Sequence, residues 1–372
     1  LTLAGAAAEP EFVTVQSQPD DLAAILYTSG TTGRSKGAML SHRNLSSNAQ
    51  VLKDFWGWRS GDVLLHMLPI FHVHGLFVAS HGALLAGAKM IWLPKLDIEQ
   101  ALRYLPESTV MMGVPTYYVR LLADERFNRD VCANMRLFIS GSAPLLMETF
   151  EEFKARTGHT ILERYGMSET IMLTSNPYDS ALGERLGGTV GMPLPGVSVR
   201  VVDDHDQEVG VDTIGHVQVK GPNVFSGYWR MPEKTREEFT SDGWFRTGDL
   251  GKFGGASIPD NYLTIVGRSK DLIISGGYNV YPKEIELVID EYPGVNESAV
   301  IGVPHPDFGE AVVAVVVPKA GQVIDEAALL ASLKGSLANY KVPKRIHFVN
   351  ELVRNTMGKV QKNALREQYK NL

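Results

Sequence analysis

The stretch between Tyr27 and Gly37 gathers hydroxyl side chains, glycines and two basic residues in one short run. Glycine lets the backbone turn sharply, so successive N–H groups can approach an anion, and hydroxyls add further donors. A lysine adds a point charge that can pair with a phosphate. The composition therefore predicts a loop that grips a polyphosphate through Thr28, Ser29, Gly30, Thr31, Thr32, Gly33 and Lys36.

This loop differs from the Walker loop, in which the lysine is followed by a serine or threonine that holds magnesium. Here Lys36 is followed by Gly37, and the pattern GxxxxGK[ST] occurs nowhere in the chain. A P-loop kinase is therefore excluded. A polar surface turn would also be rich in serine, threonine and glycine, but the unbroken run favours phosphate binding.

Two further stretches carry groups suited to a nucleotide. Tyr165 offers an aromatic face for a base, Glu169 is a hard oxygen ligand suited to magnesium, and Thr170 can donate to a phosphate. Asp249 follows a glycine and could accept both hydroxyls of a ribose. Taken singly, each stretch also fits an ordinary turn with a solvated carboxylate.

Two stretches nearer the C-terminus combine glycine with charge. Residues 267–279 are short and charged and contain a glycine pair, which suits a hinge or a close backbone approach to a ligand. Lys359 follows a glycine among small polar residues, so its amine could reach a ligand. The alternative for Lys359 is a surface lysine that serves only solubility.

Composition limits the classes of protein to which the chain can belong. Of the 372 residues, 44% are hydrophobic and 21% charged, as in ordinary globular proteins, and the length suggests two or three domains. A net charge of −6 supplies no basic excess for nucleic acid. Cys132 is the single cysteine and no apolar run approaches a membrane span, so we expect a cytoplasmic protein without nucleic-acid or membrane partners.

Strands that alternate with helices must position these groups in the first half of the chain. The pattern predicts a mostly parallel, doubly wound α/β sheet. A helix is expected from residue 42, and proline at the first turn is expected to open two others. The expected strands cover 90–93, 109–112, 137–139 and 160–163, and the expected helices cover 98–105, 115–123 and 144–157. The apolar residues 21–26 predict a further, buried strand directly before the phosphate loop.

The pattern then changes twice. Period-two strands at 197–202 and 216–219 indicate a β-rich subdomain, and a small α+β domain follows, with helices at 281–289 and 326–337 and strands at 299–303 and 311–317. We therefore expect an α/β part of the large domain at 1–187, a β-rich subdomain of that domain at 188–267, a hinge at 268–272 and a mobile C-terminal domain at 273–372.

The order and spacing of residues 28–37, 165–170, 247–250, 267–271 and 355–359 resemble the adenylate-forming superfamily of acyl-CoA synthetases. The resemblance implies that the loop holds the β- and γ-phosphates of ATP. It also implies that Glu169 binds Mg²⁺ and that Lys359 bridges carboxylate and α-phosphate oxygens, with Lys36, Glu169 and Thr170 assisting catalysis. The remaining ATP-binding positions implied are Glu163, Arg164, Tyr165, Thr170, Asp249 and Arg268.

The resemblance further implies two half-reactions with coenzyme A as a cosubstrate. Lys270 matches the family's hinge position. After adenylation the small domain would rotate there, withdraw Lys359 and present Ser275, Gly276 and Gly277 to the thiol of CoA.

Arg120 bears on the identity of the acid, because a guanidinium in a largely apolar neighbourhood is costly unless an anion meets it. Pairing with a surface carboxylate of the protein is the open alternative. The wider sequence looks most like malonyl-CoA synthetases, which implies a small dicarboxylic acid whose distal carboxylate is bound by Arg120 and Ser142. His72 and Met172 would shape the pocket.

Three expectations remain open at this level. Family members carry a longer segment before the phosphate loop, so an N-terminal segment is expected to be missing. A medium-chain or aryl acyl-CoA synthetase, or a truncated non-catalytic ATP-binding fragment, remain the alternatives. Acetylation of Lys359 would remove its charge, so a protein acetyltransferase and a deacetylase are hypothetical partners.

Overall fold

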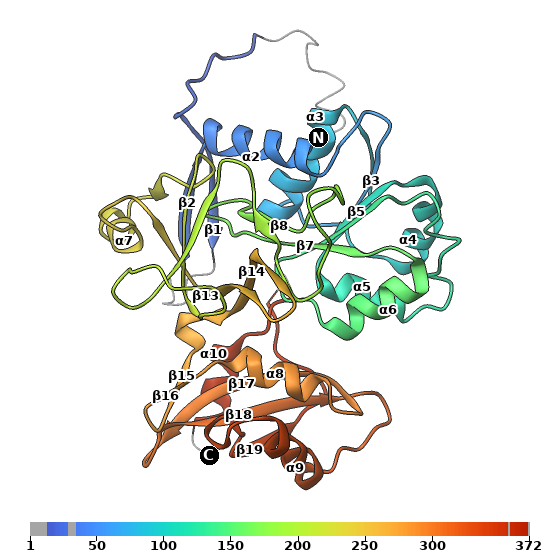
Figure 1. Cartoon of the computed structure of the whole chain (residues 1–372). Helices are drawn as coiled ribbons and strands as arrows, with labels where there is room; N and C mark the ends of the chain where they lie inside the picture. The colour runs from blue at the N-terminus through green and yellow to red at the C-terminus, as the bar shows by residue number, and fades with distance from the viewer. Residues whose placement is uncertain (1–12, 29–34, 356–357, 371–372) are drawn as a thin grey trace.

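The computed structural model describes residues 13–28, 35–355 and 358–370. A larger part contains three sheets and their helices, and the C-terminal part, drawn in orange and red, lies below it in Figure 1. Four sheets are present in the described chain, one of them in the C-terminal part. Within the described residues, no helix is both long enough and apolar enough to cross a membrane.

The central sheet has the strand order β4-β3-β5-β6-β7-β8-β9. Its first five strands are parallel, and β8 and β9 continue it antiparallel. The predicted mostly parallel sheet is confirmed. Its strands are β3 Val63–His66, β4 Lys89–Trp92, β5 Val110–Gly113, β6 Leu137–Ser140, β7 Ile161–Tyr165, β8 Thr174–Ser175 and β9 Met192–Pro193.

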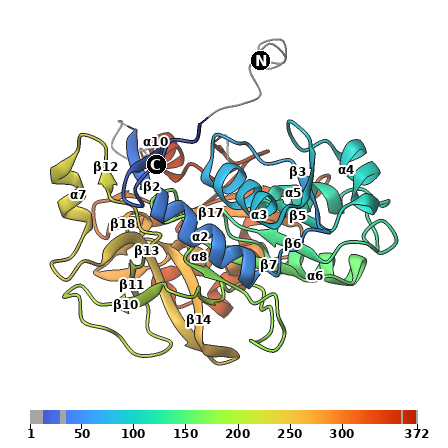
Figure 2. The ribbon, with the colours of Figure 1, turned by 90° about the horizontal axis from the view of Figure 1, so that it is seen from above.

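Helices cover both faces of this sheet because neighbouring strand residues point to opposite sides. Leu64 packs into the core beneath α2 and α3, whereas Leu65 packs into the core beneath α4, α5 and α6. Seen from above in Figure 2, α2 crosses one face of the molecule with α3 beside it. The helices are α2 His42–Phe55, a π-type helix His74–Ser80 that continues into α3 His81–Ala86, α4 Ile98–Tyr104 with a 3-10 turn Leu105–Glu107, α5 Pro115–Leu122 and α6 Met147–Thr157.

Local signals fix some of the helix ends. Ser41 caps α2, since its side chain accepts from the N–H of Asn44 at 3.1 Å while the Asn44 side chain accepts from the N–H of Ser41 at 2.8 Å. The prediction that Pro144 opens the next helix was wrong. Leu146 is extended, with ψ 142°, and α6 begins only at Met147. Pro144 therefore belongs to the preceding loop, where the fixed φ of proline is also accommodated.

The phosphate loop is framed by a small antiparallel sheet of three strands, β1 Leu22–Thr28, β2 Lys36–Ser41 and β12 Gly227–Tyr228. The strand before the loop is not the buried strand that its apolar residues suggested. It pairs with β2 alone, and its residues are partly or fully exposed because it forms the edge of this sheet.

The β-rich region is a four-stranded antiparallel sheet, as the period-two pattern predicted. It consists of β10 Ser198–Val202, β11 Gly215–Lys220, β13 Phe245–Gly255 and β14 Ile258–Arg268, and the helix α7 Pro232–Glu238 precedes β13.

The C-terminal part packs helices on both faces of a five-stranded sheet, as the expected α+β pattern requires. Ile285 of α8 and Leu329 of α9 lie in one core cluster, and Leu365 of α10 lies in the other. The elements are β15 Ile273–Ser275, β16 Tyr278–Val280, α8 Pro282–Asp290, β17 Val295–His305, β18 Gly309–Pro318, α9 Glu326–Ser336, β19 Arg345–Phe348 and α10 Lys362–Tyr369, with 3-10 turns at Ser269–Asp271 and Asn339–Lys341.

Candidate active site

Lys359 of the C-terminal part lies against residues of the larger part that are far away in sequence. The charges of Arg268, Asp249, Arg164 and Glu169 all act on its amine. The structure therefore brings four of the residues predicted to bind ATP together with the predicted adenylation lysine.

The Lys359 side chain is exposed to solvent, although protein atoms around it desolvate its amine. We call this partly enclosed position, between Lys359 and the charged residues that act on it, the cleft. Burial and the positive charge of Arg268 lower its pKa to about 8, against the opposing effect of the Asp249 carboxylate. An amine with this pKa is still largely protonated near neutral pH.

Asp249 sits at the start of this cleft, on β13 opposite Arg268 of β14. The Tyr165 hydroxyl donates to its carboxylate at 2.5 Å, and the Nε of Arg268 lies 3.2 Å from the other oxygen. Burial and the adjacent Asp249 charge raise the pKa of Tyr165 well above its ordinary value. Tyr165, Asp249 and Arg268 thus form one connected group, as expected for a ribose and base subsite.

Glu169 is buried, and burial raises its pKa. The Tyr228 hydroxyl donates to Glu169 Oε1 at 2.9 Å and accepts from the Lys36 amine at 3.2 Å, so one phenol links the two predicted groups. Lys36 also lies 3.6 Å from Glu238 and over the Tyr228 ring. The sequence reasoning missed Tyr228, because its only signal was an aromatic residue beside a glycine in a short strand.

The two ends of the phosphate loop are adjacent. Thr28 pairs with Lys36 as the last pair of the β1–β2 hairpin, and the Thr28 hydroxyl donates to the Lys36 carbonyl at 3.4 Å. The predicted loop residues Ser29, Gly30, Thr31, Thr32 and Gly33 lie outside the described residues. The described residues thus place a hairpin stem beside Glu169 through Tyr228.

Several buried polar atoms at the carboxyl ends of the central strands have no hydrogen-bond partner in the described chain. A buried polar group left unpaired costs about 1–3 kcal/mol, so such a concentration indicates a site that a ligand completes. The atoms are the Nε2 of His72, the Nε2 of His74, the Oγ of Ser140, the Nε and Nη2 of Arg164 and the Oγ1 of Thr170.

Arg164 is the most consequential of these residues. It is 3% exposed and packs so closely over Gly141 that a Cβ there would lie 2.5 Å from the guanidinium. Burial lowers its pKa to about 9. The preceding residue, Glu163, points elsewhere and accepts from the N–H of Gly188 at 2.9 Å, and burial raises its pKa to about 8.

Only some of the residues predicted to line the acyl pocket lie close together. Ser142 has a left-handed backbone, φ 71°, and its hydroxyl lies 3.4 Å from His74 Nδ1. Burial and the charge of Arg164 hold the pKa of His74 well below its ordinary value, so this ring is neutral. His72 feels the charge of Lys359, and Met172 is buried. His74, two residues after His72, was not predicted as a site residue, although the alternating His-Val-His pattern was its signal.

Arg120 lies in the last turn of α5 and is exposed. Its charge acts on Tyr117, one turn earlier, whose pKa is raised mainly by burial. The buried guanidinium in this region is therefore that of Arg164, while Arg120 reaches solvent.

The predicted hinge and CoA residues lie on the C-terminal side. Lys270 is the middle residue of the 3-10 turn Ser269–Asp271, and Asp271 pairs with Arg366 at 2.7 Å. Ser275, Gly276 and Gly277 form the turn between β15 and β16, where the two glycines have positive φ and the Gly276 N–H donates to the Phe308 carbonyl.

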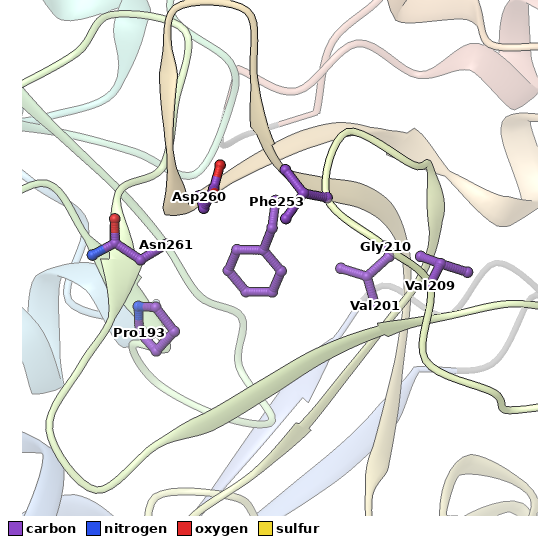
Figure 3. Close-up of a pocket in the computed structure, with 8 residues that line it drawn as sticks. Pro193, Val201, Val209, Gly210, Phe253, Asp260 and Asn261 are labelled. Carbon is purple, nitrogen blue, oxygen red and sulfur yellow. The ribbon is translucent and has the colours of Figure 1, made fainter.

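A shallow hollow of about 270 Å³ lies elsewhere, on the β-rich sheet, and is shown in Figure 3. Its lining is mainly apolar and contains none of the predicted site residues. We therefore do not assign the chemistry to it. The lining includes Pro193, Val201, Val209, Phe253, Asp260 and Asn261.

The described chain holds no group of three or more acidic, histidine or cysteine side chains arranged around a metal. A magnesium ion typically uses one or two carboxylates, substrate phosphates and water. Glu169, with a buried carboxylate beside the phosphate-loop stem, fits such an ion only together with a nucleotide.

Comparison with known proteins agrees with this site. A family model described as AMP-binding enzyme matches residues 2–229, and one described as AMP-binding enzyme C-terminal domain matches residues 284–359. The mitochondrial malonate–CoA ligase of Mus musculus is 41% identical over 382 aligned positions, covering 93% of this chain. The chain spans only 64% of that relative's length.

Two crystal structures of MatB from Rhodopseudomonas palustris are similar along the whole chain. Both are 59% identical, and this chain covers 72% of each. The TM-score is 0.95 with the ATP-bound structure and 0.81 with the apo structure. The backbone of this chain is thus more similar to the ATP-bound structure than to the apo structure. These matches confirm the resemblance seen in the sequence: the chain belongs to the family of AMP-binding enzymes.

Proposed function

We propose that the protein forms malonyl-CoA, and methylmalonyl-CoA to a lesser degree, from the free dicarboxylic acid, ATP and CoA through an acyl-adenylate. One observation carries the proposal. Among the described residues, the Nε and Nη2 atoms of the buried Arg164 have no hydrogen-bond partner. The charge of Arg164 acts on His74, which lies beside Ser142, and on Lys359. An apolar fatty acid would leave that charge unpaired, whereas a second carboxylate would meet it.

At the nucleotide end, Lys36 and the loop it closes would bind the β- and γ-phosphates. Asp249 would accept the ribose hydroxyls, and Arg268 would stay between ribose and phosphate. Glu169 would hold Mg²⁺ against the phosphates, where the ion would neutralise part of their charge. The Tyr228 hydroxyl fixes the orientation of Glu169 for this role.

At the acyl end, Arg164, which the family resemblance assigned to ATP, would instead bind the distal carboxylate together with Ser142. Arg120, predicted for that role, is exposed and would lie at the mouth of the pocket. His72 and Met172 would shape the space around the short chain. A site built to pair with a carboxylate rejects analogues that lack it far better than an apolar pocket rejects an extra methylene. Acetate and fatty acids are therefore expected to be poor substrates.

In the first half-reaction, an oxygen of the proximal carboxylate forms a bond to the α-phosphorus while the bond to the β-phosphate oxygen breaks and pyrophosphate leaves. Negative charge grows on the oxygens around the α-phosphorus, and the protonated Lys359 would stabilise that charge. Thr170 would donate to the α-phosphate through its hydroxyl, which has no hydrogen-bond partner among the described residues.

In the second half-reaction, the CoA thiolate attacks the acyl carbon and AMP leaves. The C-terminal part would rotate about Lys270, so that Lys359 leaves the cleft and the turn Ser275–Gly277 enters it. Rotation of a rigid part at a short hinge is a common device for presenting a second set of groups to one site.

Lys359 would also be the point of control. Nε-acetylation would delete the charge that the first half-reaction requires. A normal adenylation rate in homogeneously acetylated protein would refute this regulatory role.

The test is a panel of acids assayed by ATP–pyrophosphate exchange and then by CoA consumption. Malonate is expected to give the highest kcat/KM in both assays, followed by methylmalonate. A preference for medium-chain or aryl acids would select the alternative ligase. ATP binding without exchange for any acid would indicate a non-catalytic nucleotide-binding fragment of the longer relatives.

The arginine at the mouth has its own test. Arg120→Ala is expected to lower the preference for malonate over acetate, measured as the ratio of kcat/KM values, by about tenfold. Solvent screens an exposed charge, so the effect should be smaller than for a buried one. An unchanged ratio would remove Arg120 from the pocket.

A further inference from the structure

The backbone on either side of Lys359 is drawn into a closed arrangement. Arg354 and Val360 form an antiparallel bridge, the N–H of Asn355 donates to the Lys359 carbonyl at 2.9 Å, and the N–H of Lys359 donates to Asn355 Oδ1 at 3.0 Å. Gly358 takes the left-handed φ of +73° that a side chain would disfavour. These bonds orient the stretch locally, but they do not by themselves attach it to the rest of the C-terminal part.

Arg354 makes that attachment on the N-terminal side of Lys359. Its Nη1 donates to the Gly358 carbonyl at 2.6 Å, and its Nη2 pairs with the carboxylate of Glu297 on β17. The guanidinium thus connects the peptide immediately before Lys359 to a strand of the sheet. Burial raises the pKa of Glu297, while Arg354 opposes that rise.

Lys362 makes a second attachment on the C-terminal side. Its amine donates to Glu286 of α8 at 2.5 Å, and the same carboxylate oxygen accepts from the N–H of Val300 on β17 at 2.9 Å. Burial alone would raise the pKa of Glu286, but Lys362 and Lys283 hold it below its ordinary value. The Lys359 stretch is therefore tied to the α8–β17 layer at both ends.

We propose that Arg354 and Glu297 form a positioning pair that holds the Lys359 amine in the cleft during the first half-reaction, with Lys362 and Glu286 as the second tie. The proposal rests on the function proposed above for Lys359. In the described chain, the hydrogen bonds of this pair run to Gly358 and to each other, and none runs to a residue predicted to bind ligand. The pair acts through Lys359 and not on the substrate.

The competing reading is that the pair only stabilises the C-terminal part. The two half-reactions separate these readings, because Lys359 is needed for adenylation and not for transfer to CoA. A displacement of about 1 Å in a reacting group can cost about a hundredfold in rate. A positioning role therefore predicts a defect in one half-reaction, and a stabilising role predicts none or an equal one in both.

The experiment compares the parent protein with Arg354→Ala, Arg354→Lys and Glu297→Gln. Glu284→Gln is the matched control, since Glu284, on α8 of the same C-terminal part, also pairs with a cation, Lys341, at 2.5 Å. We expect kcat of malonate-dependent pyrophosphate exchange to fall about 10- to 100-fold in Arg354→Ala and Glu297→Gln, with KM for ATP within about twofold. Arg354→Lys should fall between these variants and the parent, since lysine cannot donate to both partners in the same fork. Transfer of preformed malonyl-adenylate to CoA should stay within about twofold of the parent in all variants.

A second readout does not depend on turnover. Trace acylation of Lys359 by acetic anhydride, quantified by peptide mass spectrometry across pH, reports the apparent pKa of its amine. The parent should give a value near 8. Arg354→Ala should move it toward the ordinary lysine value, because the amine leaves its buried position and the charges of Arg268 and Arg164. The Glu284→Gln control should match the parent.

The outcomes are distinguishable. If the parent protein catalysed no pyrophosphate exchange with any of the acids, the proposed function would be refuted. The labelling profile alone would then decide the positioning role. Unchanged exchange together with an unchanged labelling profile in Arg354→Ala and Glu297→Gln would overturn the proposal. An equal loss in both half-reactions would overturn it as well.

Discussion

On the side of the larger part, the candidate site contains buried polar atoms that have no hydrogen-bond partner within the described ranges, whereas on the C-terminal side the backbone around Lys359 is bonded at both ends. Arg164, His74 and Thr170 represent the first condition. The ion pairs Arg354–Glu297 and Lys362–Glu286 represent the second.

The difference follows from what each side does in the proposed reaction. A surface that binds a ligand must present groups that remain unsatisfied until the ligand arrives, and the folded chain carries their cost meanwhile. A surface that delivers one charge needs only a fixed position, so its polar groups can be satisfied within the protein. The following predictions test this contrast.

Removing the delivered charge should have the largest effect. Lys359→Ala is expected to reduce malonate-dependent pyrophosphate exchange by about 10²–10³-fold, as expected when a donor to developing negative charge is lost. Transfer of preformed malonyl-adenylate to CoA should be nearly unchanged. Lys370→Ala, which removes an exposed lysine near the C-terminus that pairs with Glu367, is the control. Exchange within tenfold of the parent would mean that Lys359 is not the adenylation lysine.

Removing an unsatisfied group from the other side should weaken function but strengthen the fold. Arg164→Met is expected to lower kcat/KM for malonate by about 10²-fold, because a buried charge partner of the carboxylate is lost. The free energy of unfolding without ligand should rise by about 1–3 kcal/mol, since the buried unpaired donors are gone. Pyrophosphate exchange at varied malonate concentrations measures the first effect, and denaturant unfolding without ligand measures the second. A destabilised variant would mean that Arg164 is a structural residue.

The pH dependence tests the electrostatics of the delivered charge. The pKa of Lys359 is lowered to about 8, so its proton is lost as the pH rises through that value. The kcat/KM for ATP reports groups of the free enzyme and should fall by about tenfold for each pH unit above about 8. Lys359→Arg keeps its charge across this range and should lack the decline. A flat profile of the parent up to pH 10 would contradict the lowered pKa.

Most of the fold could be predicted from the sequence, because the signals for strands and helices are periodic and local. Alternating apolar residues in the strands of the β-rich region and proline at the first turn of α5 appear where expected. The prediction for the start of α6 was wrong because proline also fits a loop, and the extended backbone of Leu146 shows that the loop continues past Pro144. The exposure of β1 failed because edge position depends on partners far away in sequence.

The sequence predicted which residues form the candidate site, but it did not predict which of their polar groups lack hydrogen-bond partners. Lys359, Asp249, Arg268 and Glu169 could be chosen from motifs, and the structure places them together. Which arginine is buried without a partner could not be chosen, because Arg120 and Arg164 differ only in tertiary surroundings. Tyr228 and Glu297 were also not predicted, because each acts through a hydrogen bond to a residue more than fifty positions away in the sequence.

The smallest expected effect concerns Glu163, a buried acid in the larger part whose carboxyl group accepts hydrogen bonds from backbone N–H groups of the protein. Burial raises its pKa to about 8, above an ordinary value of 4.5, while the N–H groups of Gly188 and Leu145 partly oppose the rise. A raised folded-state pKa contributes stability that is complete below the unfolded value and is lost as the pH rises toward 8. Glu163→Gln cannot ionise and can still accept from Gly188. Its melting temperature should therefore decline less between pH 5 and pH 8 than that of the parent. Glu367→Gln, an exposed acid, should follow the parent, and parallel curves for all three proteins would show that Glu163 is ionised in the fold and that the ligand side holds an unneutralised carboxylate.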